Sequence, residues 1–440
     1  MSTTMRPEQA AQLVSDALGR TPQDDLEAAV VLEAWGGVPT SEGLRLAAEA
    51  NAAIRRIPTP LRGADDKLEL PEEKVRRAAA GVAVLIAIIA MAAWAVPLSE
   101  TYGGANVANA WRIALPITLA LQSWFTVRHA SQRGLGSMPG HRVEYVHLSL
   151  TAIALVSLLP APSGPLAALF VMTWSTGAVL VQRGWFVSFA MVNGAVAVAL
   201  LAGVEPVLAL GIAMAGMTIA AYVATLGYKQ DLVVPGPNAR ASLVGVTGAL
   251  LGVILVIDPS IEWNAAGYVP VLALIPALVG NVWASTYLSR LWSEIPQYLL
   301  EYSVSSDSTA VGRLAWRVVP RALYRFVGAA VPLSIVVLLI ISRTGVPTDR
   351  IVLLLLGLAT AMIASLGIVL LDVFGRQVWA FVATAAGCAS ALLLVMTGSY
   401  PFPGAALMLG ALVTLALSAN PIRLALNQPD RTLGSAMLLP

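Results

Sequence analysis

The chain has 440 residues, of which 57% are hydrophobic and only 12% are charged. That charged share is about half of what a soluble domain uses to cover its apolar interior, so water-soluble and disordered classes are excluded. The composition predicts an all-α integral membrane protein.

Charge is distributed unevenly along the chain. Residues 1–74 carry 8 Lys/Arg and 13 Asp/Glu, whereas residues 75–440 carry 19 and 12. The first part is predicted to be a small cytoplasmic, acidic helical segment that ends in a proline-bearing linker. Its expected helices cover about 7–18, 22–35 and 40–56. The single cysteine, Cys388, excludes an intrachain disulfide and a cysteine-based zinc site.

Apolar runs long enough to cross about 30 Å of hydrocarbon recur from Val75 onward. Twelve spans are predicted, at approximately 78–98, 108–127, 145–160, 165–182, 185–204, 206–227, 241–257, 267–288, 323–342, 351–371, 377–397 and 404–419. They divide into a first six-span bundle (75–227), an inner linker (228–240) and a second six-span bundle (241–440).

The basic residues predict the orientation of these spans. With a cytoplasmic amino terminus, the inner segments hold 24 of the 27 Lys and Arg residues, and only Arg112, Arg343 and Arg350 fall elsewhere. Cytoplasmic loops are the ones enriched in Lys and Arg, so both termini are expected inside. The excess of arginine over lysine (24 to 3) is typical of a bacterial protein, and the membrane is then the plasma membrane.

Spans two and eight share a pattern of a proline, an amide, a tryptophan and a hydroxyl. Its members are Pro116, Gln122, Trp124 and Thr126 in one span, and Pro276, Asn281, Trp283 and Ser285 in the other. Because these spans are six apart and run in the same direction, the pattern predicts two bundles related by a pseudo-two-fold axis.

Polar side chains at bilayer depth are costly and face a cavity or another helix. Arg112 lies four residues inside the second span on the outer side, where it either snorkels to the headgroups or lines a central cavity. Gln122 and Asn281 either join helices by hydrogen bonds or line the same cavity. The other candidates for a substrate cavity are Trp124, Asn193 and Trp283. Asp372 is interpreted as an interfacial carboxylate.

The sequence lacks motifs for catalysis. Its three lysines follow Asp66, Glu73 and Tyr228, so it has no phosphate-binding P-loop. The three histidines, which lack zinc-protease spacing, are interpreted as side chains at the membrane edge and are His129, His141 and His147. We therefore expect no enzymatic activity, no metal, no cofactor and no nucleic-acid partner.

The longest inner loop, 289–322, combines aromatic residues at helical spacing with arginines that recur every four residues. Together with the inner end of span two, it is expected to form a cytoplasmic basic face of Arg128, Arg290, Arg313, Arg317, Arg321 and Arg325. Such an amphipathic segment either binds anionic membrane lipid or docks a phosphate-bearing lipid substrate or a partner enzyme.

Twelve spans in two halves resemble the multidrug/oligosaccharidyl-lipid/polysaccharide exporter superfamily, in particular its polysaccharide flippase branch. The passage from Ala284-Ser-Thr-Tyr-Leu-Ser-Arg290 through Asp307 to Val331-Pro-Leu-Ser-Ile-Val is similar to that family's stretch between spans eight and nine. The resemblance implies export of a polysaccharide or lipid-linked glycan by alternating access, with Arg112 at the pyrophosphate. Arg128 and Arg290 would close the inner ends of the related spans.

Two alternatives stay open at this point. A small-molecule or drug antiporter would need a carboxylate relay, and the spans hold no Asp or Glu in their middle. A non-transporting scaffold of an envelope-polysaccharide synthesis complex would use residues 1–74 to bind a glycosyltransferase or synthase. The acidic segment at 1–74 departs from the exporter family, whose members commonly begin close to their first span.

Overall fold

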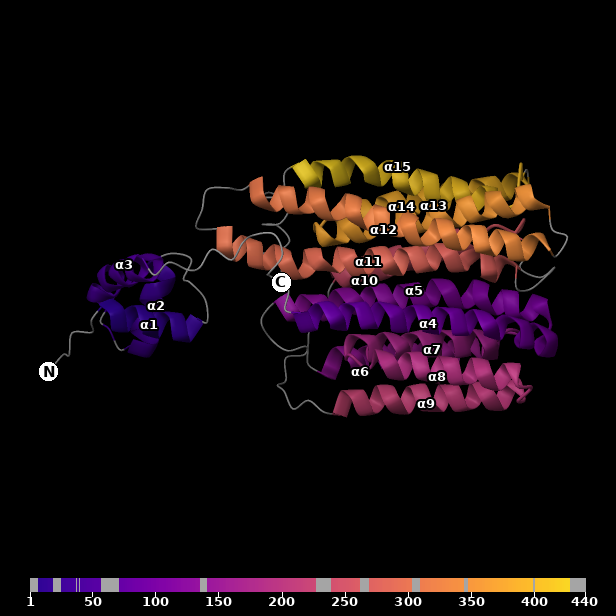
Figure 1. Ribbon diagram of the computed structural model, residues 1–440, viewed down its shortest axis with the longest axis horizontal. Helices are drawn as coiled ribbons and strands as arrows, with labels where there is room; N and C mark the ends of the chain where they lie inside the picture. The colour runs from indigo at the N-terminus through magenta and orange to yellow at the C-terminus, as the bar shows by residue number, and fades with distance from the viewer. Residues whose placement is uncertain are drawn as a thin grey trace. The chain divides into compact units, whose positions relative to one another are not determined.

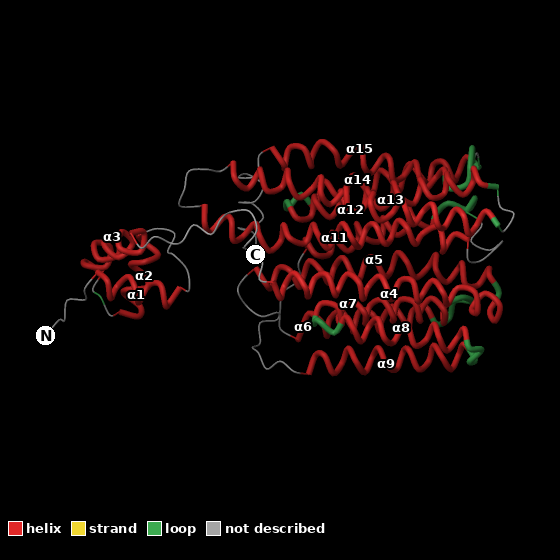
Figure 2. The backbone as a smooth tube through the Cα atoms, viewed as in Figure 1, coloured by secondary structure: helices red, strands yellow, loops and turns green. Residues whose placement is uncertain are grey.

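The computed structural model describes residues 7–18, 25–36, 38, 40–56, 71–134, 141–226, 239–261, 269–302, 309–343, 347–398 and 400–427. Every regular element in these ranges is an α-helix (Figures 1 and 2). The chain divides into two compact units, residues 1–74 with 293–311 and residues 75–292 with 312–440.

Three short helices pack together in the amino-terminal unit. They are α1 (Pro7–Leu18), α2 (Asp25–Gly36) and α3 (Thr40–Arg56), and each contacts the other two. Their shared core is small and consists mostly of alanine, with Val14, Leu32 and Leu46 as larger members. The side-chain amide of Asn51 donates to the carboxylate of Asp25 (2.6 Å), which joins α3 to the start of α2. The three helices predicted within residues 1–74 are therefore present.

A helix occupies each of the twelve predicted spans. These helices are α4 (Pro71–Tyr102), α5 (Gly104–Gly134), α6 (His141–Leu158), α7 (Gly164–Gln182), α8 (Phe186–Leu201), α9 (Pro206–Leu226), α10 (Ala239–Val256), α11 (Val269–Tyr302), α12 (Thr309–Ser342), α13 (Thr348–Val373), α14 (Gln377–Thr397) and α15 (Ala405–Asn427). Seven of them, α7, α9, α10 and α12–α15, are long and apolar enough to cross a membrane. By the length and composition of these helices the chain is a multi-pass membrane protein.

The remaining five helices do not combine the length and the apolar composition of these seven, and α8 is apolar but only 16 residues long. Shorter apolar stretches lie in α4, α6, α8 and α11, and none was found in the described residues of α5. In α5, polar residues such as Arg112 and Gln122 interrupt the apolar sequence. That all twelve helices cross the membrane therefore stays a prediction.

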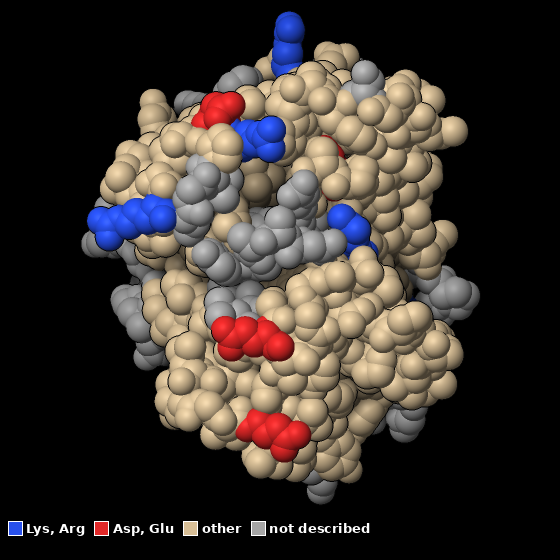
Figure 3. Space-filling view, turned by 90° about the vertical axis from the view of Figure 1, so that its right-hand side faces the viewer, with Lys and Arg blue, Asp and Glu red and all other residues tan. Residues whose placement is uncertain are grey.

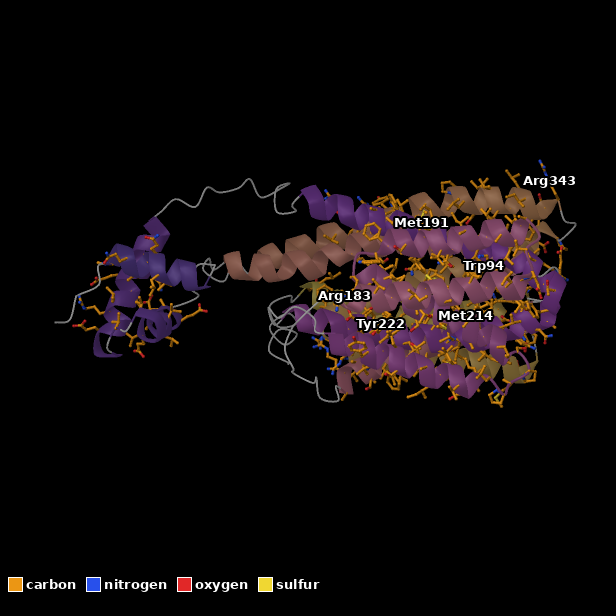
Figure 4. All side chains as sticks on the ribbon, turned by 90° about the horizontal axis from the view of Figure 1, so that it is seen from below. Trp94, Arg183, Met191, Met214, Tyr222 and Arg343 are labelled. Carbon is orange, nitrogen blue, oxygen red and sulfur yellow. The ribbon has the colours of Figure 1, made fainter. Side chains whose placement is uncertain are left out.

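The helices run alternately in opposite directions. The described residues of the connections after α4, α6, α8, α10, α12 and α14 lie at one end of the unit, and the turns after α7 and α13 lie at the other (Figure 2). Arg343 and Arg183 mark these two ends in Figure 4. The end with Arg343, which faces the viewer in Figure 3, exposes only scattered charges of both signs. It corresponds to the predicted outer side, and we call it the outer end.

Figure 1 shows α4–α9 on one side of this unit and α10–α15 on the other. The most extensive contact between any two helices in the described part of the chain is that of α5 with α10, which joins the two groups. We call this contact the α5–α10 seam. Some contacts within the first group recur between the corresponding helices of the second group. α9 packs against α7 and α8, and in the same way α15 packs against α13 and α14.

Two turns in corresponding positions have the same hydrogen bonds. After α7 the amide of Trp185 donates to the carbonyl five residues earlier (2.8 Å), and after α13 the amide of Arg376 does the same (2.8 Å). Gly184 and Gly375 precede these residues with φ of 82° and 71°. Glycine adopts this left-handed conformation without strain, so both turns are encoded by a glycine in the same place.

The inner loop 289–322 differs from the expectation of separate interfacial helices. Residues 289–302 continue α11 without a break, and residues 309–322 continue α12. Spans eight and nine were expected to end where the charged residues of the loop begin. The backbone hydrogen bonds of a helix can continue from an apolar stretch into a charged one, so both helices extend beyond their apolar parts. The residues between the two helices, 303–308, lie outside the described part of the chain.

Candidate functional site

Three glycines of α10 line the α5–α10 seam. A methyl group added at Gly252 would lie 2.5 Å from Cα of Pro116, and one at Gly248 would lie 2.5 Å from a backbone carbonyl oxygen of α5. At Gly245 the nearest atom, Cβ of Trp124, would be 3.3 Å away. The two backbones therefore approach as closely as in other membrane helix pairs that are joined by small residues.

Arg112 extends the seam face of α5 by one turn toward the outer end. Positions 112, 116, 119 and 123 are three or four residues apart and share one side of the helix. Residues 116, 119 and 123 are the ones nearest to Gly252 and Gly248. The side chain of Arg112 is half-buried, and its Nε is shielded from solvent without a hydrogen bond to the described residues. That Arg112 lines a central cavity stays a prediction.

The structure does not gather the other predicted cavity residues at one point. Trp124 lies on the seam. Gln122 donates to a backbone carbonyl of α7 (3.4 Å), and Asn193 donates to a carbonyl of its own helix, α8 (2.8 Å). Asn281 and Trp283 lie on α11, where Asn281 is half-buried and Trp283 is 39% exposed. Arg112 and Trp124 alone among the six share the seam face of α5.

A buried polar cluster in the first group of helices was missed by the sequence analysis. His147 of α6 is fully buried, with Nε2 2.8 Å from the hydroxyl of Ser175 in α7. Its ring stacks on that of Phe125 in α5, with 4.4 Å between centroids. One turn earlier in α6, Glu144 forms a buried ion pair with Arg183. His147, expected at the membrane edge, is therefore buried between α5, α6 and α7 instead of being exposed at the surface.

This cluster holds α5, α6 and α7 together. The hydroxyl of Thr151 donates to the carbonyl of His147 (2.8 Å) and also lies against Ser175. These buried hydrogen bonds favour one packing of the three helices, although Nδ1 of His147 and Oε1 of Glu144 have no hydrogen-bond partner within the described residues. The sequence did contain a signal for this cluster. Glu144, His147 and Thr151 are three and then four residues apart, which places all three on one face of α6.

The predicted basic residues lie in different surroundings. Arg128, at the inner end of α5, is only 9% exposed, and this burial lowers the pKa of its guanidinium. Arg321 and Arg325 of α12 are exposed. The guanidinium carbon of Arg325 lies 4.2 Å from the ring centroid of Tyr287, a cation–π contact. The side chains that lie outside the described residues are those of Arg290, Arg313 and Arg317.

Three carboxylates are buried in the described part of the membrane unit, and all lie near helix ends. They are Glu144, Asp258 and Asp372. Asp258 follows α10 at the outer end and caps the start of α15, because its Oδ2 accepts from the amide of Ala406 (2.8 Å). Asp372 was expected at the interface, but it is 8% exposed.

Within the described residues, no group of His, Cys, Asp or Glu side chains is arranged to hold a metal ion. No protein-family model matches the chain, and no curated protein or solved structure is significantly similar to it. Its candidate site is therefore interpreted from geometry: an arginine and a tryptophan on one helix face, where two groups of helices meet.

Proposed function

We propose that the chain is a flippase-type exporter, which moves a polysaccharide or lipid-linked glycan across a bacterial plasma membrane by alternating access. The observation that carries the proposal is the position of Arg112 on the seam face of α5. A guanidinium forms short, charge-assisted and often bidentate hydrogen bonds with phosphate. A substrate that carries a phosphate or pyrophosphate between glycan and lipid suits such a residue.

Alternating access needs two bodies that separate on one side of the membrane and stay in contact on the other. The helices α4–α9 and α10–α15 are suited to this role because the α5–α10 seam is their most extensive contact in the described structure. Matching helix contacts and matching glycine turns at Gly184 and Gly375 support an internal repeat. On this proposal all twelve helices cross the membrane, with both termini in the cytoplasm.

A drug antiporter is less well supported. Proton relays of antiporters place carboxylates within the membrane, along the transport pathway. The buried carboxylates Glu144, Asp258 and Asp372 lie near helix ends rather than in the middle of a helix.

A scaffold of a polysaccharide synthesis complex is the second candidate. It is favoured by the α1–α3 unit, which has a core of its own and exposes Val30 and Leu44 at 58% and 54%. A glycosyltransferase or synthase is the partner that this function requires.

The proposal is tested by replacing Arg112 in protein reconstituted into liposomes. The probe is a fluorescent lipid-linked oligosaccharide with a pyrophosphate, and flipping is measured by its accessibility to an impermeant quencher. We expect Arg112→Ala to slow flipping about 10- to 100-fold, since hydrogen bonds to charged groups contribute about 1.5–3 kcal/mol. Arg112→Lys should restore part of the rate, because lysine keeps the charge without the planar fork.

Arg343→Ala is the matched control, because Arg343 is an exposed arginine at the outer end. It should flip the probe at the wild-type rate. If a stable, well-incorporated Arg112→Ala protein did so as well, Arg112 would not bind substrate and the proposal would lose its main support.

A further inference from the structure

The three buried carboxylates differ in how their charge is compensated. Asp258 accepts hydrogen bonds from backbone amides on both oxygens, including those of Ser260 (2.9 Å) and Ala406 (2.8 Å). Glu144 is paired directly with Arg183 through Oε2, although its Oε1 accepts no hydrogen bond from the described residues. Asp372 has no such direct partner: its Oδ1 is shielded from solvent and accepts no hydrogen bond from the described residues.

The helices that pack against α13 in the described structure are α10, α14 and α15, and each brings charged or polar residues toward the inner end. From α10, Arg240 attracts the carboxylate electrostatically. From α14, Gln377 donates to the backbone carbonyl of Asp372 (3.2 Å), and Arg376 is the residue that precedes this helix. The one charged residue of α15, Arg423, is exposed.

A carboxylate in this position has two accessible states. Ionised, it is attracted to Arg240, but an oxygen without a hydrogen bond is held away from water at a cost in free energy. Protonated, it loses both this cost and the attraction. We infer that Asp372 is a proton-binding site, and that its charge state changes the attraction between the inner ends of α13 and α10.

The consequence reaches the seam because Arg240 lies in the first turn of α10, the helix that packs along α5. Proton uptake would weaken the attraction between the inner ends of α10 and α13, and proton loss would restore it. Proton binding follows from the surroundings of Asp372 alone. Its use as a driving ion for export rests on the proposed function.

The test is infrared difference spectroscopy on the full-length protein in lipid nanodiscs, between about pH 5.5 and about pH 8. Ordinary Asp and Glu side chains titrate near about pH 4, so the band of a protonated carboxyl group in this window reports a perturbed one. We expect the band in the wild-type protein and its loss in Asp372→Asn. It should persist in Glu144→Gln, a buried control, and in Asp349→Asn, an exposed control on the same helix.

A second measurement leaves Asp372 in place. Arg240→Gln should raise the midpoint of the band by about one pH unit or more, because a nearby cation favours the ionised carboxylate. Arg423→Gln, at an exposed arginine of α15, should leave the midpoint unchanged.

Three results would overturn the inference. They are the absence of the protonated-carboxyl band in the wild-type protein, a band that persists in Asp372→Asn, and a midpoint that is unchanged in Arg240→Gln. A midpoint that falls when sodium replaces a larger cation at constant ionic strength would also overturn it, since the site would then bind a metal cation. None of these results bears on the flipping assay of Arg112 variants. That assay can fail while Asp372 still binds a proton.

Discussion

The close approach of α5 and α10 can be tested by adding one methyl group at a time. The added Cβ of Gly248→Ala or Gly252→Ala would lie 2.5 Å from the α5 backbone. Carbon atoms pack best at about 3.5–4.0 Å, so the helices would have to separate by about 1 Å. Overpacking of this kind costs about 1–3 kcal/mol. Gly245→Ala, whose Cβ would have its nearest neighbour at 3.3 Å, should cost less.

Other glycines of the chain provide the matched control. A Cβ at Gly194 of α8 or at Gly211 or Gly216 of α9 would meet no atom within 4 Å. There an alanine should stabilise the protein by up to about 1 kcal/mol, because it favours the helix more than glycine does. The seam and control variants should therefore differ by about 2–4 kcal/mol for the same chemical change.

The measurement is the thermal unfolding midpoint of each purified variant in one detergent. The midpoint should be highest for Gly194→Ala and Gly211→Ala, lower for Gly245→Ala, and lowest for Gly248→Ala and Gly252→Ala. The contact with Gly252 involves the backbone of Pro116, so no side-chain rotation can relieve it. Equal midpoints for Gly252→Ala and Gly211→Ala would refute the close packing of the seam.

Two further predictions concern the outer end and the topology. Asp258→Ala should lower the unfolding midpoint by an amount equivalent to about 1–3 kcal/mol, because buried amides at the start of α15 lose their acceptor; an unchanged midpoint would show that the cap is dispensable. Single cysteines at positions 99–107, around the turn between α4 and α5, should react with an impermeant reagent in intact cells when placed in a Cys388→Ala background, because few basic residues lie on that side. Labelling at 131–140 but not at 99–107 would invert the topology.

The positions of the helices could be predicted from hydropathy because the rule behind it is local. A backbone in lipid must satisfy its hydrogen bonds within its own segment, so a long apolar run becomes a helix. The glycine turns at Gly184 and Gly375 are equally local, since a positive φ is a property of one residue. Helix ends were less predictable: α11 and α12 extend well past their apolar parts.

The buried residues could be predicted only in part. A helix that is apolar on all sides gives no periodic signal for the face that packs against protein. His147 and Asp372 were therefore placed at the interface, although both are buried between helices. Arg128 likewise was expected on a cytoplasmic basic face, and its side chain is buried.

The role of Arg112 shows most clearly where sequence reasoning ends. The residue type and its depth in the predicted span left two possible positions for the guanidinium, at the lipid headgroups or in a cavity. Both positions solvate the charge of a guanidinium in a membrane. The glycines that pack against this face of α5 lie on α10, more than a hundred residues further along the chain. Composition and local hydrogen bonding are enough to make twelve helices. Which faces of α5 and α10 meet depends on close contacts between distant segments, and those exist only in the folded protein.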